Sequence, residues 1–293
     1  MDLVDVTQSV LDGVLFGATY SLIGIGFTLI FGVMHKINMS YAAASVGGAY
    51  VSLLILKLAA TPPILTILVA AAAGGVIGFV VYIACFRFIP LSQPQATLMS
   101  TVGMLLLLDE AIVHLTDGVP LSYPALASDA VFDVGPFTLR GDLLSAFALG
   151  CVTMVLLLIL LYRTKLGIAT RAVSQRPVAA QLCGISVARV NALTFVIAGV
   201  LGGVAAAMIG SAIGVLSPLL TLPLTVKGLI VTVIGGLGSI PGAIVAGLLV
   251  GGLENLFQVL RGVSERDLYV MLLLFVFLVF RPGGIFAAPA GRD

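Results

Sequence analysis

The sequence predicts an all-α polytopic membrane protein with about eight or nine helical membrane segments, one of them a Gly-rich broken segment. Three observations favour this fold class: 60% of the 293 residues are hydrophobic, only 9% are charged, and the mean hydropathy is +1.22. Soluble chains carry roughly 25% charged residues, so this chain has too few polar groups to cover a surface exposed to water. A net charge of +1 gives no basic field for nucleic acid. We therefore take the bilayer as the solvent and residues 1–293 as a single transmembrane domain.

The membrane segments follow from the length of the apolar runs, because a helix needs about 20 apolar residues to cross the hydrocarbon core. The runs are Val14–Met34, Met39–Leu58, Ile64–Phe86, Ala96–Leu115, Leu143–Tyr162, Asn191–Gly210, Leu224–Gly235, Ile240–Leu260 and Leu268–Phe280. The stretch 224–260 is too long for one span, and a turn or a broken helix is expected inside it. The interrupting residues, assigned as hinge or packing positions, are Gly235, Gly236, Gly238, Pro241 and Gly242.

Glycine accounts for 34 residues and recurs inside the spans, as in Gly74-Gly75-x-x-Gly78 and Gly199-x-x-Gly202-Gly203. Small residues let helix backbones approach closely in lipid. The pattern fits close helix packing, and it also fits helices that slide or tilt past one another. The sequence leaves both interpretations open.

The orientation follows from the distribution of lysine and arginine, which favour the cytoplasmic side. If 162–190 is cytoplasmic and the chain crosses nine times, one face carries mostly basic residues. They are Lys36, Arg87, Arg163, Lys165, Arg171, Arg176, Arg189, Arg281 and Arg292, against the acid Asp293. The opposite face holds Asp2, Asp5, Asp12, Asp117, Asp129, Asp133, Asp142, Glu265 and Asp267, with Lys57, Arg140, Arg261 and Arg266. We expect the N-terminus and the loop 116–142 outside, and the C-terminus inside. The early acids also oppose a signal peptide.

The longest polar interval on the basic side is the loop 163–190. A residue before proline resists the helical region, so a new helix is expected to begin at Pro177. Gly184 supplies a left-handed stop, which gives a helix of about two turns. Such a short helix is suited to dock in a groove of another protein. The same pattern is compatible with a loop that only lies at the membrane surface.

The loop also resembles a known family. LGIATRAVSQRPVAAQLCGISVARV, from Leu166 to Val190, is similar to the coupling loop of branched-chain amino acid ABC importer permeases, with its Pro-x-Ala-Ala-x-x-x-Gly core at 177–184. Gly26–Val33 with Ile37-Asn38 resembles the end of the family's first span. Val233–Gly247 resembles its glycine-rich signature, and Phe280–Phe286 its C-terminal ending. Because these runs occur in the family's order over most of the chain, the sequence is identified as a member of that family.

The resemblance implies the membrane subunit of an importer in the bacterial inner membrane. Its implied partners are a second permease, either another copy or a paralogue, two ATPase subunits and a periplasmic solute-binding protein. The ATPases would bind ATP and Mg, and no cofactor is expected on this chain. The residues implied to contact an ATPase are Arg171, Arg176, Pro177, Ala179, Ala180 and Gly184.

Two observations from the residues themselves agree with this division of labour. A P-loop needs Gly-Lys followed by Ser or Thr, and none of Lys36, Lys57, Lys165 and Lys227 follows a glycine. We therefore expect no nucleotide site and no ATP hydrolysis on this chain. The two histidines and three cysteines lack the spacing of metal ligands, so no metal site is expected.

Ionisable groups at membrane depth are costly and usually face a cavity or a partner. Glu254 lies inside an apolar run, and we expect it in a protein-lined setting as a structural partner or a pathway group. Asp109 and Glu110 stand where the family often carries uncharged Gln or Asn, and they fit either a pathway or an interfacial position. His114 is expected to pair locally. The residues assigned to the pathway are Asn38, Tyr41, Ser45, Asp109, Glu110 and Glu254.

The solute is less well defined, because Tyr41, Ala42 and Ala43 replace a His-Gly-Glu of the family. This replacement is either drift at a packing position or a sign that the pathway is more apolar and contains a phenol. Branched-chain or related amino acids remain the leading class, with an aromatic or short-chain carboxylate as the alternative. An ion-coupled secondary transporter is a further alternative, although the first half shows no helix break to match the one at 235–242. A channel lacks a repeated selectivity sequence here, and no residues group into a catalytic site.

Overall fold

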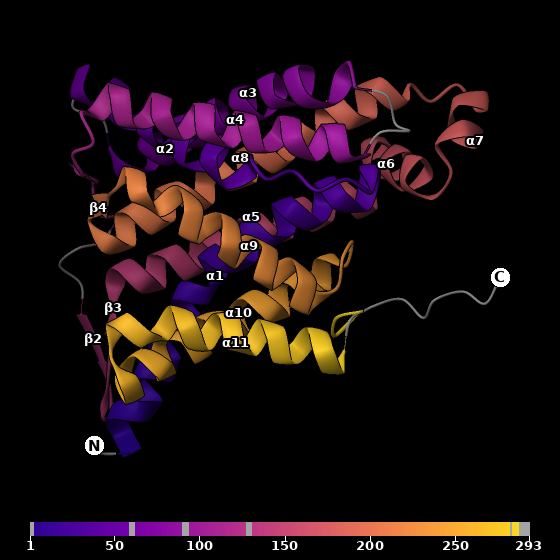
Figure 1. Ribbon diagram of the computed structural model, residues 1–293. Coiled ribbons are helices and arrows are strands. Elements are labelled where there is room, and N and C mark those ends of the chain that lie inside the picture. Colours follow the sequence, from indigo (N-terminus) through magenta and orange to yellow (C-terminus); the bar gives the residue numbers. More distant parts are fainter. Residues whose placement is uncertain (1–2, 59–61, 90–93, 127–130, 282, 287–293) are drawn as a thin grey trace.

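The computed structural model describes residues 3–58, 62–89, 94–126, 131–281 and 283–286. The orientation residues Asp2, Asp129, Arg292 and Asp293 lie outside this part of the chain. Within it the chain is mostly helical, and the long helices lie side by side along a common direction (Figure 1).

The nine apolar runs each correspond to a long helix in the described part of the chain. These helices are α1 (Leu3–Met34), α2 (Tyr41–Leu58), α3 (Pro63–Tyr82), α4 (Pro94–Thr116), α5 (Gly141–Arg163), α8 (Val187–Ile213), α9 (Thr221–Gly235), α10 (Ile240–Arg261) and α11 (Val263–Phe280). Seven described helices are long and apolar enough to cross a membrane, and α2 contributes a shorter apolar stretch, Tyr41–Ile55. The predicted fold class, a polytopic helical membrane protein, is confirmed.

The connections hold the smaller elements. A π-helical turn, η1 (Ile83–Arg87), continues α3, and a 3-10 turn, η2 (Pro218–Leu220), precedes α9. The predicted outer loop contains strands that the sequence analysis did not anticipate. β2 (Val131–Val134) and β3 (Phe137–Arg140) form an antiparallel hairpin, while β1 (Leu121–Ser122) pairs with β4 (Val215–Leu216) across the helices.

The two ends of the helix bundle differ in what they carry. The start of α1, the β2–β3 hairpin and the turn between α10 and α11 lie at one end, which we call the hairpin end (Figure 1). The helices α6 (Lys165–Gln175) and α7 (Pro177–Leu182) and the turn between α9 and α10 lie at the opposite end, the α7 end. The start of α1 and the end of α11 therefore lie at opposite ends of the bundle, and the predicted orientation in the membrane stays a prediction.

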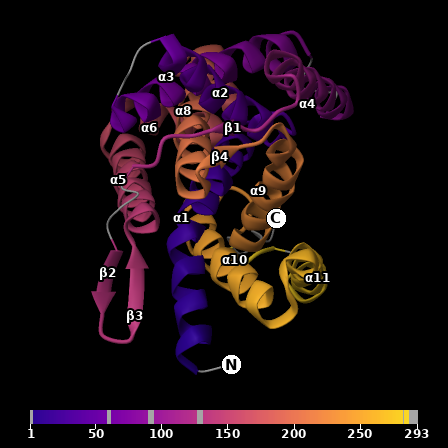
Figure 2. The same cartoon turned by 90° about the vertical axis from the view of Figure 1, so that its left-hand side faces the viewer.

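The helix α1 is the centre of the packing. It makes its most extensive contacts with α10 and also contacts α8, α9 and α5, while α3 packs closely on α8 and α2. Seen along the bundle from the hairpin end, α1 lies between α5 on one side and α10 with α11 on the other (Figure 2). The helix α4 lies at the periphery, where its contacts are mainly with α2 and η1.

Glycine makes two of these helix contacts close. A Cβ atom on Gly199 of α8 would clash with the carbonyl oxygen of Gly74 on α3. A Cβ atom on Gly17 of α1 would lie 2.7 Å from the carbonyl oxygen of Gly247 on α10. The backbones of these helices therefore touch directly, which is how helices associate in lipid when no hydrophobic driving force acts between them.

The predicted break at 235–242 is confirmed as a turn between two helices. The helix α9 ends at Gly235, and Gly236 and Gly238 adopt φ angles of 102° and 88°, which side chains with a Cβ rarely tolerate. The Ser239 hydroxyl then caps α10 by accepting a hydrogen bond from the N–H of Gly242, and Pro241 lies in the first turn of that helix.

The C-terminal motif closes onto this turn. The N–H of Ile285 donates to the carbonyl of Ile234 at 2.8 Å, and the N–H of Phe286 donates to that of Gly235 at 3.3 Å. The two sequence runs that resemble the family's glycine-rich signature and C-terminal ending are therefore in contact.

Candidate functional site

A buried ion pair joins two helices near the hairpin end. Lys227 projects from α9 and Glu254 from α10, and the lysine Nζ lies 2.7 Å from Oε1 of the carboxylate. Tyr20 of α1 completes the group, because its hydroxyl donates to the same oxygen at 3.3 Å and lies 3.2 Å from Nζ. Glu254 is only 4% exposed. The expectation that Glu254 lies in a protein-lined setting is confirmed.

Two residues of α11 extend this pair into a network of alternating charge. The Nε of Arg266 lies 3.4 Å from Oε1 of Glu254, and Oδ1 of Asp267 lies 3.5 Å from Nζ of Lys227. Arg266 also donates through Nη1 to Oε1 of Gln258 at 3.0 Å. We call Tyr20, Lys227, Glu254, Arg266 and Asp267 the charged cluster.

Of this cluster, only Glu254 was predicted from the sequence as a buried group. Arg266 and Asp267 were expected on the outer face, and Lys227 was considered only as a P-loop lysine. The signal that could have found the partner was Lys227 itself, a cation within the apolar run 224–235.

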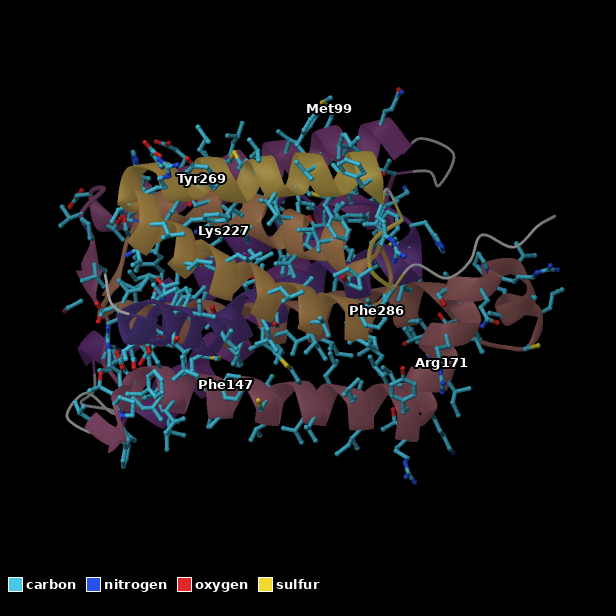
Figure 3. All side chains as sticks on the ribbon, turned by 90° about the horizontal axis from the view of Figure 1, so that it is seen from below. Met99, Phe147, Arg171, Lys227, Tyr269 and Phe286 are labelled. Carbon is cyan, nitrogen blue, oxygen red and sulfur yellow. The ribbon has the colours of Figure 1, made fainter. Side chains whose placement is uncertain are left out.

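The charged cluster lines a cavity of about 780 Å³ between α1, α8, α9, α10 and α11. Further polar residues around it are Asp5, Gln8, Ser9, Asp12, Arg140, Asn255 and Gln258. The apolar residues of its lining include Phe16, Ile209, Leu220 and Leu224. Lys227 lies in the half of the molecule nearer the hairpin end (Figure 3).

Three residues assigned to the pathway lie in the helix core, away from this cavity. The Asn38 side chain accepts hydrogen bonds from the backbone N–H and the hydroxyl of Ser40 and so orders the start of α2. The Tyr41 hydroxyl donates to the carbonyl of Ala198 at 2.9 Å, and Ser45 donates to the carbonyl of Tyr41. In this structure their polar groups are engaged within the protein, and a pathway role for them stays a prediction.

Replacing Tyr41 with phenylalanine tests that role. Loss of the hydrogen bond to Ala198 is expected to lower the free energy of unfolding by about 1 kcal/mol. If Tyr41 only packs, solute uptake by the assembled protein will stay at the wild-type rate. Thermal unfolding and uptake are measured for Tyr41→Phe beside Tyr162→Phe, which removes a hydroxyl from an exposed ring. A changed solute preference in Tyr41→Phe would instead place Tyr41 in the pathway.

The acids of α4 are separate from the charged cluster. Asp109 is half-buried, and its Oδ1 makes no hydrogen bond, whereas Glu110 and His114 are exposed. None of the three is among the residues that line the cavity around Glu254. The structure therefore does not bring Asp109 and Glu110 together with Glu254, and their assignment to the pathway stays a prediction.

The α7 end holds the short helix expected from the sequence. The helix α7 begins at Pro177, and Gly184 follows it with φ 80°, as predicted. Ala180 points into a small apolar cluster with Val33, Val173 and Val190. The remaining predicted contact residues are exposed: Arg171, Arg176, Pro177, Ala179 and Gly184. Ala180 therefore anchors α7 to the protein.

The outward face of α7 was missed by the sequence analysis. Val178 is 71% exposed and Leu182 is 86% exposed. Large apolar side chains on a short helix within a polar loop are the signal that could have identified this face, because they are costly to leave in water.

A second cavity lies beside α6 and the Gly-rich turn. It measures about 420 Å³ and lies between α1, α5, α6 and the 237–241 turn, with Arg171 and Phe286 among its walls. Both residues lie toward the α7 end (Figure 3).

Lys36 is buried after the end of α1, and its Nζ donates to the Thr97 hydroxyl at 2.8 Å. Burial lowers the pKa of the Lys36 ammonium.

These features define a class of protein. A bundle of long apolar helices, with a charged cavity near one end and a short exposed helix at the other, defines a polytopic helical membrane protein. Comparison with known sequences defines the family. The profile described as "Branched-chain amino acid transport system / permease component" matches residues 9–280. The chain belongs to this family.

Individual relatives match this chain over nearly their full length. The high-affinity branched-chain amino acid transport system permease protein BraD of Pseudomonas aeruginosa is 30% identical over 295 residues, which cover 96% of each chain. The corresponding permease protein LivH of Salmonella typhimurium is 31% identical over 298 residues, again 96% of each chain. A solved metal-chelate type ABC transporter in an inward-facing conformation aligns with 94% of this chain and 85% of its own, at 16% identity and a TM-score of 0.45.

Proposed function

We propose that this chain forms the membrane passage of an ATP-driven importer for branched-chain aliphatic amino acids. The observation that carries the proposal is the match to the permease family along residues 9–280, together with relatives of nearly the same length that are named for this transport. The whole chain acts as a single transmembrane domain in the bacterial inner membrane. Its hairpin end and N-terminus face outside and its α7 end faces the cytoplasm.

The proposed partners follow from the same assignment. A second permease, identical or paralogous, completes the passage, two ATPase subunits bind at the α7 end, and a periplasmic binding protein delivers solute at the hairpin end. ATP and Mg act on the ATPases, because this sequence has no Gly-Lys dipeptide to build a P-loop. The loop 163–190, with α6 and α7, receives the ATPase.

Uptake by the complete complex tests this function. The complex, with its binding protein, is placed in vesicles and supplied with ATP, and accumulation of radiolabelled leucine is measured. Saturable leucine and valine uptake without competition from aromatic or short-chain carboxylate solutes is expected. Uptake of a carboxylate in preference to leucine would replace the proposed solute class by the alternative.

The exposed face of α7 is expected to bind the ATPase through its apolar side chains. Leu182→Glu should leave the permease folded, because this side chain is 86% exposed, but weaken ATPase binding by about tenfold or more. Binding is measured by co-purification and titration of the ATPase subunit. The control is Leu219→Glu in η2, the same change at an 83% exposed position outside α7.

Ala180→Glu is expected to act differently, because it forces a carboxylate into the cluster of Val33, Val173 and Val190. It should detach α7 from the protein and abolish transport.

Equal ATPase binding by Leu182→Glu and the wild type would contradict the assignment of the exposed α7 face to ATPase binding.

A further inference from the structure

The charged cluster contains a buried acceptor that the protein leaves unused. Oε1 of Glu254 receives the hydrogen bonds from Lys227 and Tyr20, but Oε2 makes no hydrogen bond although the carboxylate side chain is only 6% exposed. Buried polar atoms are nearly always paired, because an unpaired one keeps its desolvation cost. Glu254 lines the 780 Å³ cavity, but Oε2 itself is covered in this conformation, so a rotation of the carboxylate is needed to present the free oxygen to a molecule within it.

A hydrogen-bond donor close to the Glu254 carboxylate is also unused. The Nε of Arg266 is buried and makes no hydrogen bond, although it lies 3.4 Å from Oε1 of Glu254. Of the other guanidinium nitrogens, Nη1 donates to Gln258. A guanidinium presents its N–H groups as a planar fork that matches a carboxylate. Arg266 therefore has an unused donor for an anion, and it lies beside Glu254, which has an unused acceptor for an ammonium group.

We propose that this cavity is a binding site for the zwitterionic head group of an aliphatic amino acid during its passage. Oε2 of Glu254 accepts a hydrogen bond from the α-ammonium group, and Arg266 donates to the α-carboxylate. The two groups of an amino acid are attached to one carbon atom, so they require a cation and an anion site side by side. This assignment deepens the proposed function and rests on it.

The rest of the cavity fits the same class of solute. Phe16, Ile209, Leu220 and Leu224 offer an apolar wall for a branched side chain. The volume lies within the range of about 300–1,000 Å³ that is usual for small-molecule sites.

A carboxylate without an ammonium group is disfavoured by the charges. It would leave Oε2 of Glu254 without a donor and would add a negative charge to a cavity in which four acids already outnumber three cations; the acids are Asp5, Asp12, Glu254 and Asp267, and the cations are Arg140, Lys227 and Arg266. Lys227 cannot balance this charge, since it is already engaged by Glu254 and Tyr20.

Protection from chemical labelling tests binding directly. The native cysteines are replaced, and Val259→Cys is introduced in the cavity wall, where Val259 is 42% exposed. The complete complex is held in nanodiscs so that both faces are open, and a charged thiol reagent is applied with and without leucine. We expect leucine to slow labelling of this position but not of Val119→Cys, an exposed site outside the cavity. The carboxylate analogue 4-methylpentanoate should not protect it.

Two substitutions then assign the groups. Glu254→Gln keeps an oxygen for Lys227 but removes the carboxylate, and Arg266→Gln removes the fork from a side chain that is 32% exposed. Each should lower leucine uptake per ATP hydrolysed by about tenfold, because each removes a hydrogen bond to a charged group. Glu265→Gln, the same change at an exposed neighbour outside the cavity, should leave uptake unchanged.

The outcomes separate the two proposals. No leucine uptake by the wild-type complex would reject the proposed function. Uptake by the wild type that Glu254→Gln and Arg266→Gln leave unchanged would reject the binding site alone. If Glu254→Gln fails to assemble, the labelling of Val259→Cys decides, and absence of leucine protection, or equal protection by 4-methylpentanoate, overturns the proposal.

Discussion

Lys227→Met is expected to destabilise the protein by about 3–5 kcal/mol, because it leaves the Glu254 carboxylate buried without its nearest cation. The lysine ammonium is 2.7 Å from a carboxylate that is 4% exposed, and Arg266 lies farther away at 3.4 Å. The loss is measured as the change in thermal and denaturant unfolding of the purified permease.

The matched control breaks a more exposed ion pair, in which the aspartate side chain is 12% exposed. Arg140 and Asp142 form a pair in which the arginine side chain is 58% exposed, so Arg140→Met should cost less than about 1 kcal/mol. The double variant Lys227→Met with Glu254→Leu should recover much of the stability, because it replaces both charges by apolar groups. Equal losses from Lys227→Met and Arg140→Met would show that the pair is hydrated and carries no special cost.

Gly199→Val is expected to separate α3 from α8 and to destabilise the protein by about 1–3 kcal/mol or more. Even a single Cβ at Gly199 would clash with the carbonyl oxygen of Gly74, and backbone cannot move aside as a flexible side chain can. Valine adds two methyl groups to that clash. Unfolding of the purified permease and its yield from the membrane are both expected to fall.

We expect the opposite effect on stability from Gly103→Ala on α4. A Cβ at Gly103 would meet nothing within 4 Å. The change should be neutral or should stabilise the helix by about 0.5–1 kcal/mol, because alanine loses less backbone freedom than glycine. If Gly199→Val were as stable as Gly103→Ala, the close contact between α3 and α8 would be absent in the membrane.

The membrane segments could be predicted because their signal is local. Each of the nine runs carries its own hydropathy, and the helix ends at Pro177 and Gly235 depend on residues within one turn. The β2–β3 hairpin and the pairing of β1 with β4 were missed. The second pairing joins Leu121 to Leu216 and depends on how the helices between them pack.

The candidate site could be predicted only in part for the same reason. Glu254 stands out as a single acid in an apolar run, but its partners Tyr20 and Lys227 are 234 and 27 residues away in sequence. Which of several polar residues meet it is decided by the crossing of α1, α9, α10 and α11. The inward direction of Ala180 was likewise invisible, because a six-residue helix shows too little periodicity to identify its buried face.

The contacts of α9, α10 and α11 make these three helices a closed frame. At the hairpin end, Asp267 of α11 meets Lys227 of α9 at 3.5 Å. At the other end, the hydrogen bonds from Ile285 and Phe286 clasp the chain after α11 to the last turn of α9. Because contacts join α9, α10 and α11 at both ends, we expect these three helices to tilt as one rigid piece and not to separate from one another. Such a piece would carry α1 with it, because Gly17 and Gly247 bring the α1 and α10 backbones into direct contact, and Tyr20 and Ser21 of α1 donate hydrogen bonds to Glu254 and Ile244 of α10.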